Sequence, residues 1–274
     1  MNRFSATWSL MKSSLTVLLE DKKMLLLPIF SGICTLIVGL TFILPLVFSG
    51  GLRSFAIFES LPGWMMFITI FLFYYLNYFF IIFFNSGAIL YAIMHIRDKN
   101  PTFGVVFNQL RDRMPHLLGW TAIAATIGII INSIENQSDF VGKLVAGLIG
   151  LSWTVTSFLV LPVLVIEQKG PLESLKESAG MLKKSWGEQL IGHFSFGLIF
   201  VALLIGAAII TLPLFFLGEI FIFIGFVILI IFGLILGILQ WILQSIFMAT
   251  LYLYVRENRL PGSFTHSQID RAVR

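Results

Sequence analysis

Six long stretches of this 274-residue chain carry no charged residue near their centres, and they constrain its fold more than any other feature. They cover residues 24–48, 63–94, 116–134, 143–166, 189–213 and 220–255. Each is long enough to cross a hydrocarbon layer of about 30 Å as a helix rising about 1.5 Å per residue. Backbone groups in lipid must be bonded within their own segment, and the connections are short, so the stretches predict helices rather than barrel strands. Charged residues are only 12% of the chain, which excludes a water-soluble core.

The basic residues predict the orientation of these spans. Sixteen of the 18 Lys and Arg lie in the N-terminal segment, the 95–115 and 167–188 connections and the C-terminal tail. Only Arg53 and Lys143 lie in connections on the opposite side. The positive-inside rule therefore predicts an inner-membrane protein with both termini in the cytoplasm. With ten of the 14 acidic residues on the same side, the cytoplasmic face has a net charge of +6.

The exits of the second, fourth and sixth spans share a short motif that indicates a threefold internal repeat. Each exit places Lys or Arg two residues before a proline. The three segments, called here the exit pentads, are Arg97-Asp98-Lys99-Asn100-Pro101, Glu167-Gln168-Lys169-Gly170-Pro171 and Glu257-Asn258-Arg259-Leu260-Pro261. The sequence predicts a single membrane domain over residues 1–274, with pseudo-repeats at approximately 1–96, 97–166 and 167–256 and a tail at 257–274.

Each odd-numbered span is preceded by a segment with helical amphipathic spacing. The expected apolar faces are Phe4, Trp8, Met11, Leu15 and Leu18 in the first segment, Phe103, Val106, Phe107, Leu110 and Met114 in the second, and Leu172, Leu175, Ala179, Leu182 and Trp186 in the third. Ser5, Ser9, Lys12, Ser13 and Thr16 form the expected polar face of the first segment. We expect these helices at the cytoplasmic headgroup boundary, although the same faces could instead pack on the cytoplasmic end of the bundle.

The sixth stretch is longer than a membrane requires. Its 36 uncharged residues, from Ile220 to Val255, correspond to about 54 Å of helix. The stretch must therefore tilt strongly, break near Gly225 or Gly233, or begin as a re-entrant piece.

Chemistry-bearing residues are scarce. The intramembrane polar candidates are amides, which interhelical hydrogen bonding explains better than a transport path; they are Asn77, Asn85, Asn132, Gln240 and Gln244. None of His95, His116, His193 and His266 has the spacing of a zinc site. No nucleophile elbow, phosphate loop or intramembrane carboxylate pair is present, so the sequence predicts no catalytic residue, cofactor or metal, and no enzyme.

Three parts of the sequence carry a resemblance to a known family. They are Phe4 to Leu10 with Asp21-Lys22-Lys23 and Leu27-Pro28, Leu161-Pro162-Val163 to Glu167, and Ala249-Thr250-Leu251-Tyr252 with Pro261-Gly262. Together they resemble an uncharacterised bacterial family of six-span membrane proteins, a domain of unknown function. This family is distantly similar to the membrane-anchor domain of some glycerophosphodiester phosphodiesterases. The resemblance implies a bacterial inner-membrane protein and supplies no catalytic residues.

The expected function is that of a non-enzymatic membrane protein, a scaffold or accessory protein whose basic cytoplasmic face engages anionic lipid, a partner protein or a second copy of the chain. The alternative is a transporter or channel for a lipid or small hydrophobic solute; nucleic acid is not an expected partner. The candidate lipid or partner contacts are Trp8, Lys12, Lys22, Lys23, Arg97, Lys99, Arg111, Arg113, Lys169, Lys176, Lys183, Lys184, Trp186, Arg256 and Arg259.

Overall fold

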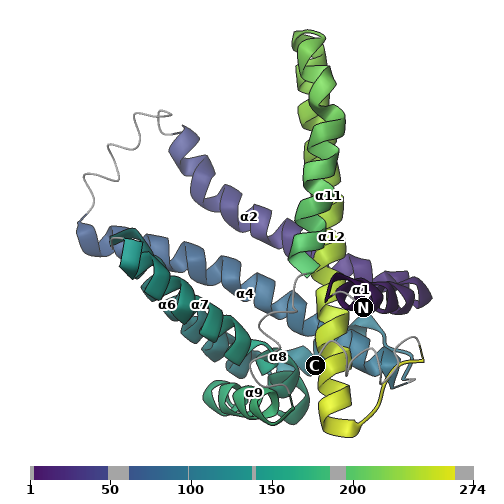
Figure 1. The fold of residues 1–274 in the computed structure, drawn as a ribbon. Coiled ribbons are helices and arrows are strands. Elements are labelled where there is room, and N and C mark those ends of the chain that lie inside the picture. The colour runs from purple at the N-terminus through teal and green to yellow at the C-terminus, as the bar shows by residue number, and fades with distance from the viewer. Residues whose placement is uncertain (1–2, 49–61, 98, 138–139, 186–195, 263–274) are drawn as a thin grey trace. The chain divides into compact units, whose positions relative to one another are not determined.

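The computed structural model describes residues 3–48, 62–97, 99–137, 140–185 and 196–262, and these residues form helices with no strand among them (Figure 1). The α-helices are α1 (Arg3–Glu20), α2 (Leu26–Phe48), α4 (Gly63–Ile96), α5 (Phe103–Asp112), α6 (Met114–Gln137), α7 (Phe140–Ser157), α8 (Val160–Glu167), α9 (Pro171–Ser185), α11 (Phe196–Thr211) and α12 (Glu219–Glu257). Two short 3-10 helices, η1 (Lys22–Leu25) and η4 (Leu212–Phe216), join α1 to α2 and follow α11.

The prediction of six spanning helices is confirmed, because the described residues include six helical segments with the length and apolar composition that a span requires. The helical segments that are long and apolar enough to cross a membrane are Lys22–Leu44, Gly63–Ile96, Met114–Glu135, Gly142–Glu167, Ile199–Phe216 and Glu219–Glu257. They coincide with the six apolar stretches of the sequence. The fifth stretch was expected to begin at residue 189, but residues 189–195 lie outside the described part of the chain.

The chain divides into two compact units whose segments are interleaved along the sequence. The first unit contains Met1–Pro28, Ala92–Asn100 and Met181–Arg274, and the second contains Ile29–Tyr91 and Pro101–Gly180. Each unit draws on more than one of the expected pseudo-repeats, so the unit boundaries do not coincide with the repeat boundaries.

In the first unit, α11 and α12 form an antiparallel hairpin, and α1 packs across α12 (Figure 1). The buried side of α1 consists of Leu10, Ser13, Ser14, Val17 and Leu18. The short helix η1 continues this contact with α12. Asp21 starts η1 as its N-cap, because its carboxylate accepts a hydrogen bond from the backbone N–H of Lys23 at 3.0 Å.

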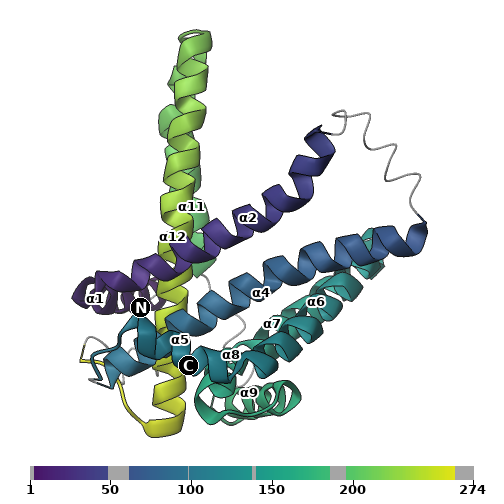
Figure 2. The same cartoon turned by 180° about the vertical axis from the view of Figure 1, so that it is seen from behind.

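In the second unit, α6 and α7 lie side by side in both views (Figure 2). The hydroxyl of Tyr75 on α4 donates a hydrogen bond to the carbonyl of Leu118 on α6 at 3.2 Å. On the other side of α4, the rings of Phe42 and Phe73 meet edge to face with centroids 5.3 Å apart, which joins α2 to α4. Aromatic pairs of this kind contribute about 0.5–1.5 kcal/mol beyond the apolar area they bury.

The second, fourth and sixth spans all end in a buried segment just before an exit pentad. Residues 86–93 of α4 and 160–165 of α8 are buried throughout, and residues 242–253 of α12 are buried except for two half-buried positions. In α4 and α12, the 23 residues before the buried end would extend about 34 Å, close to the thickness of the hydrocarbon core. In both helices the length beyond these 23 residues is mostly buried against protein.

The long helix α12 is continuous over its 39 residues, so the expected alternative of a break near Gly225 or Gly233 is wrong. Both glycines serve close packing instead. A Cβ atom at Gly225 would lie 3.1 Å from the ring of Phe215 in η4, and one at Gly233 would lie 3.7 Å from Leu204 of α11. The absence of a side chain at Gly225 allows η4 to fold back onto α12.

The fourth span does break, between α7 and α8 at Phe158 and Leu159. Pro162 accounts for the break, because it has no N–H for an intrahelical bond and its ring would clash with the carbonyl four residues before it. The hydroxyl of Ser178 in α9 donates to the carbonyl of Thr156 at 2.7 Å and accepts from the N–H of Leu159 at 3.0 Å. One buried side chain thereby satisfies backbone groups on both sides of the break.

Candidate functional site

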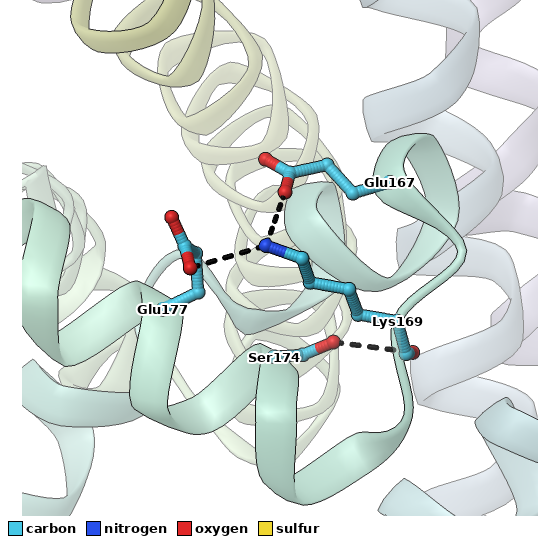
Figure 3. Close-up of polar contacts among 4 residues, drawn as sticks. All are labelled: Glu167, Lys169, Ser174 and Glu177. Carbon is cyan, nitrogen blue, oxygen red and sulfur yellow. Dashed lines mark hydrogen bonds and ion pairs between the residues drawn. The ribbon is translucent and has the colours of Figure 1, made fainter.

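The second exit pentad folds into a compact cluster of charges around Lys169 (Figure 3). The Lys169 amine lies 2.8 Å from the carboxylate of Glu167, at the end of α8, and 3.1 Å from that of Glu177, the seventh residue of α9. Hydrogen bonds to Glu167 and Glu177 raise the pKa of Lys169 above its ordinary value. The amine is consequently positive at any physiological pH, and the cluster has a net negative charge when both carboxylates are ionised.

Backbone geometry positions this cluster. Gln168 follows α8 in the left-handed conformation with φ 57°, which ends the helix and turns the chain toward α9. At the start of α9, the N–H of Ser174 donates to the carbonyl of Gly170 at 2.9 Å, and the Ser174 hydroxyl donates to the carbonyl of Lys169 at 3.3 Å. These bonds hold the pentad and the first turn of α9 together, so Lys169 reaches Glu177 without rearrangement.

The third exit pentad ends its helix in the same way. Asn258 caps α12 in the left-handed conformation with φ 51°, at the position that Gln168 holds in the second pentad. The N–H groups of Asn258 and Arg259 donate to the carbonyls of Tyr254 and Leu253 at 3.1 and 3.3 Å, so two carbonyls of the last helical turns are satisfied. The corresponding residue of the first pentad, Asp98, lies outside the described residues.

The first and third exit pentads are joined by an ion pair. The guanidinium of Arg97 contacts the carboxylate of Glu257 through its Nη2 atom. These two residues occupy the first position of their pentads, and both belong to the first unit. Close by in the chain, His95 Nε2 lies 3.2 Å from the carboxylate of Glu20 at the end of α1. Two of the four histidines, His193 and His266, lie outside the described residues.

Helix α1 has two apolar sides, which the sequence did not predict. The expected apolar face is divided, because Leu18 is buried whereas Trp8 and Leu15 are 48% and 37% exposed. Ser13, expected on the polar face, is instead buried on the side that packs on α12. Small serine side chains on that side allow α1 to approach α12 closely, which leaves the larger residues Trp8, Leu15 and Leu19 outside.

Helices α5 and α9 differ in how they use their predicted apolar faces. In α5, Val106 and Leu110 are buried, and Phe107 stacks on Phe83 of α4 with ring centroids 5.9 Å apart. In α9, by contrast, the expected apolar face is not the side buried against protein. Leu172 is 67% exposed, and the buried residues are Ser174, Ser178 and Met181. The hydrogen bonds of the two serines to the α7–α8 break and to the pentad determine which side of α9 faces inward.

The candidate contact residues differ widely in exposure. Trp8, Lys12, Lys22, Lys23, Lys99, Arg111, Lys176, Arg256 and Arg259 are exposed, Arg97 and Lys169 are half-buried in ion pairs, and Arg113 is buried. Lys183 and Lys184 belong to α9, but their side chains and all of Trp186 lie outside what the structure describes.

The five candidate amides are divided between the two units. Asn77, Asn85 and Asn132 belong to the second unit, and Gln240 and Gln244 to the first. Asn77 donates to the carbonyl of Phe73 in its own helix at 2.8 Å, a local bond rather than an interhelical one. Gln240 faces α11, since a Cβ atom at Gly197 would lie 3.6 Å from its Nε2 atom. The transport alternative needs these amides to share a cavity, which stays untested.

Sequence reasoning overlooked the partners of the basic residues. Glu167, Glu177 and Glu257 are the carboxylates that hold Lys169 and Arg97, and Ser178 bonds to the α7–α8 break. The sequence did indicate a partner for Glu257, because the first residues of the first and third exit pentads, Arg97 and Glu257, carry opposite charges. Ser178 gave no comparable signal, since a serine on an amphipathic helix is ordinarily assigned to the exposed side.

The Family of unknown function (DUF6159) matches residues 64–262, more than two thirds of the chain. The chain belongs to the DUF6159 family. The DUF6159 match extends from α4 through α12 and includes all three exit pentads. No curated protein and no solved structure matches the chain. The resemblance to the glycerophosphodiester phosphodiesterase anchor therefore stays a prediction.

Proposed function

We propose that this DUF6159 protein is a non-enzymatic membrane protein whose cytoplasmic face binds anionic phospholipid, with α1 and η1 as the principal contact. The observation that carries the proposal is the outer side of α1, called here the outer stripe. Trp8, Leu15 and Leu19 form the outer stripe and are 48%, 37% and 58% exposed. Seven and four residues separate them, so they lie along one side of the helix.

The outer stripe is not needed for the packing of the first unit. Leu10, Ser14 and Val17 already bury the opposite side of α1, and the helix contacts α12. Half-exposed Trp and Leu side chains in a row are costly in water, because full burial of each is worth roughly 1.5–3 kcal/mol. An amphipathic helix lying in the headgroup region would cover the stripe with acyl chains.

Basic residues next to the outer stripe favour an anionic surface. Lys12 is exposed on α1, and Lys22 and Lys23 are exposed on η1, which leads directly into the first span. Each lysine near an anionic membrane surface contributes about 1 kcal/mol of attraction. Three such lysines together with three apolar side chains match the two-part chemistry of a phospholipid, whereas a protein partner would have to supply both an apolar groove and an acidic rim.

Lipid selectivity of the full chain tests the proposal. The protein is reconstituted into bilayers of phosphatidylcholine and phosphatidylglycerol, and electron paramagnetic resonance of spin-labelled lipids gives the relative association of the two headgroups. The account predicts a preference for phosphatidylglycerol that falls in high salt and in a variant carrying Lys12→Gln, Lys22→Gln and Lys23→Gln. Equal association of both lipids with the unaltered protein would contradict it.

Lys143 offers a matched control. It is exposed at the start of α7, and the distribution of basic residues predicts that it lies on the opposite side of the membrane from α1. The substitution Lys143→Gln removes one exposed charge without touching the proposed surface. Restricting the anionic lipid to the leaflet that contacts α1 should leave this variant as selective as the unaltered protein.

A further inference from the structure

Arg113 is a buried guanidinium with no acidic partner in the described part of the chain. Only 8% of the residue is exposed. Its Nη1 atom donates to the carbonyl of Gln109 at 2.8 Å, whereas its Nε atom is buried without a hydrogen bond. An arginine keeps its charge in proteins, and a buried charge is normally paired.

The environment of Arg113 does not neutralise this charge. Burial lowers the pKa of the Arg113 guanidinium, and the charge of neighbouring Asp112 raises it, but Asp112 is itself exposed and forms no ion pair with Arg113. The bond to Gln109 is a cap for the last turn of α5, so it accounts for one nitrogen of the guanidinium and leaves the rest of its charge unmatched.

A second unpartnered nitrogen lies three residues further along the chain. The Nδ1 atom of His116 is buried and has no hydrogen bond. Arg113 is the turn residue that joins α5 to α6, and its carbonyl accepts a hydrogen bond from the N–H of Leu117 at 3.0 Å. His116 is the third residue of α6, so Arg113 and His116 both belong to the elbow between α5 and α6.

The first turn of α6 adds to the positive potential at this elbow. Arg113 directly precedes Met114, the first residue of α6, so His116 lies in the opening turn of that helix. Helix N-termini favour anions because their first N–H groups point outward and the helix dipole is positive there. Guanidinium, imidazole and helix N-terminus are together suited to a tetrahedral oxyanion.

We propose that the elbow formed by Arg113 and His116 binds a phosphate group, supplied by the headgroup of a phospholipid. This inference deepens the proposed function and rests on it for the position of α5 at the cytoplasmic membrane surface. The two modes of binding differ. The outer stripe of α1 attracts many lipids without a defined site, whereas the elbow binds one phosphate group through specific side chains. Arginine is the preferred residue for such recognition, since its planar fork matches two phosphate oxygens.

Native mass spectrometry of the delipidated full chain with added phosphatidylglycerol tests the site. The unaltered protein should retain one lipid tightly, and Arg113→Gln should weaken that binding by about tenfold, the loss of one charge-assisted contact. Lys143→Gln is the control, since Lys143 is exposed and belongs to neither proposed lipid-binding surface; it should change the affinity less than about twofold. Equal losses in both variants would overturn the site.

Two further measurements complete the test. If Arg113→Gln does not fold, Arg113→Lys keeps a positive charge but lacks the planar fork, and unchanged lipid affinity in this variant would overturn the proposal. Inorganic phosphate is the second probe, and it distinguishes the source of the anion. Failure of 10 mM phosphate to displace the lipid supports a headgroup site, whereas displacement by phosphate through Arg113 assigns the elbow to the free ion and overturns the lipid assignment.

The outcomes for the elbow and for the proposed function are separable. Spin-label selectivity for phosphatidylglycerol depends on Lys12, Lys22 and Lys23, and it should persist in the Arg113→Gln variant. Persistence of selectivity with no Arg113-dependent lipid would remove the elbow alone. Retention of one lipid through Arg113, in a protein without bulk selectivity, would remove the role of α1 and leave the elbow intact.

Discussion

The hydroxyl of Ser178 in α9 accepts a hydrogen bond from the backbone N–H of Leu159 at 3.0 Å, at the break between α7 and α8. The same hydroxyl donates to the carbonyl of Thr156 at 2.7 Å. Helix α9, which the sequence predicts to lie on the cytoplasmic side, thereby satisfies backbone groups of the fourth span that its own helices leave unpaired. This bond links the amphipathic helix to the span that precedes it.

Removal of this hydroxyl should destabilise the protein. The variant Ser178→Ala leaves a buried N–H and a buried carbonyl unpaired, and each such loss costs about 1–3 kcal/mol. Equilibrium unfolding in mixed detergent micelles measures the change. Ser152→Ala is the control, because the Ser152 hydroxyl bonds only to the carbonyl of Leu148 in its own helix at 2.8 Å. Similar losses in the two variants would show that the α9 contact is unimportant.

The charge cluster of the second exit pentad predicts a pH-independent contribution. Lys169→Met removes two ion pairs of a partly exposed amine, which together are worth about 0.5–2 kcal/mol. Because the folded pKa of Lys169 is raised, the stabilisation is complete below the ordinary lysine pKa and is lost only as the pH rises through the higher folded value. The stability difference between the two proteins should be equal at pH 6 and pH 8, and a difference that disappears between these values would contradict the cluster.

The ion pair between Arg97 and Glu257 predicts a rescue by charge exchange. Arg97→Glu places two carboxylates together, and Glu257→Arg places two guanidiniums together, so each single variant should be less stable than the unaltered protein. Their combination restores opposite charges. A double-mutant cycle from unfolding measurements should give a coupling energy of about 0.5–1 kcal/mol or more in favour of the double variant. Strictly additive losses would mean that the two pentads do not interact.

Two glycines of α12 predict opposite responses to the same substitution. Gly225→Ala brings a Cβ atom to 3.1 Å from the Phe215 ring, so the ring must shift and stability should fall by about 1–3 kcal/mol. At Gly237 nothing lies within 4 Å of the added atom, and alanine is the better helix former by about 1 kcal/mol. Gly237→Ala should therefore be neutral or stabilising in the same unfolding assay. Matching losses at both positions would exclude packing as the cause.

The sequence predicted the spans because hydrocarbon imposes a single requirement, twenty or so apolar residues in a row. It could not predict how much of an apolar stretch faces lipid and how much faces protein, since both environments select the same side chains. For that reason Ile220 to Val255 was expected to tilt, break or re-enter, whereas α12 runs unbroken into a buried end.

Side-chain partners were less predictable than helices. Lys169 was recognised as a candidate from its place in the pentad, but its contact with Glu177 depends on how α9 leaves the turn at Gln168. In the sequence, nothing separates Arg113 from the other basic residues. Only the structure shows that Arg113 is buried, in the elbow between α5 and α6. The repeat itself stays a prediction, supported by the matching left-handed residues Gln168 and Asn258.

Every role assigned to the basic residues depends on their lying on one side of the membrane. Cysteine labelling of whole cells tests this directly, in a background with the lone Cys34 replaced by serine. Single cysteines are placed at the exposed positions Lys12, Arg111, Lys176 and Lys143, and a membrane-impermeant maleimide is added before or after permeabilisation. We predict that Lys143→Cys reacts in intact cells and that the other three react only after permeabilisation. Labelling of Arg111→Cys and Lys176→Cys from opposite sides would contradict the account.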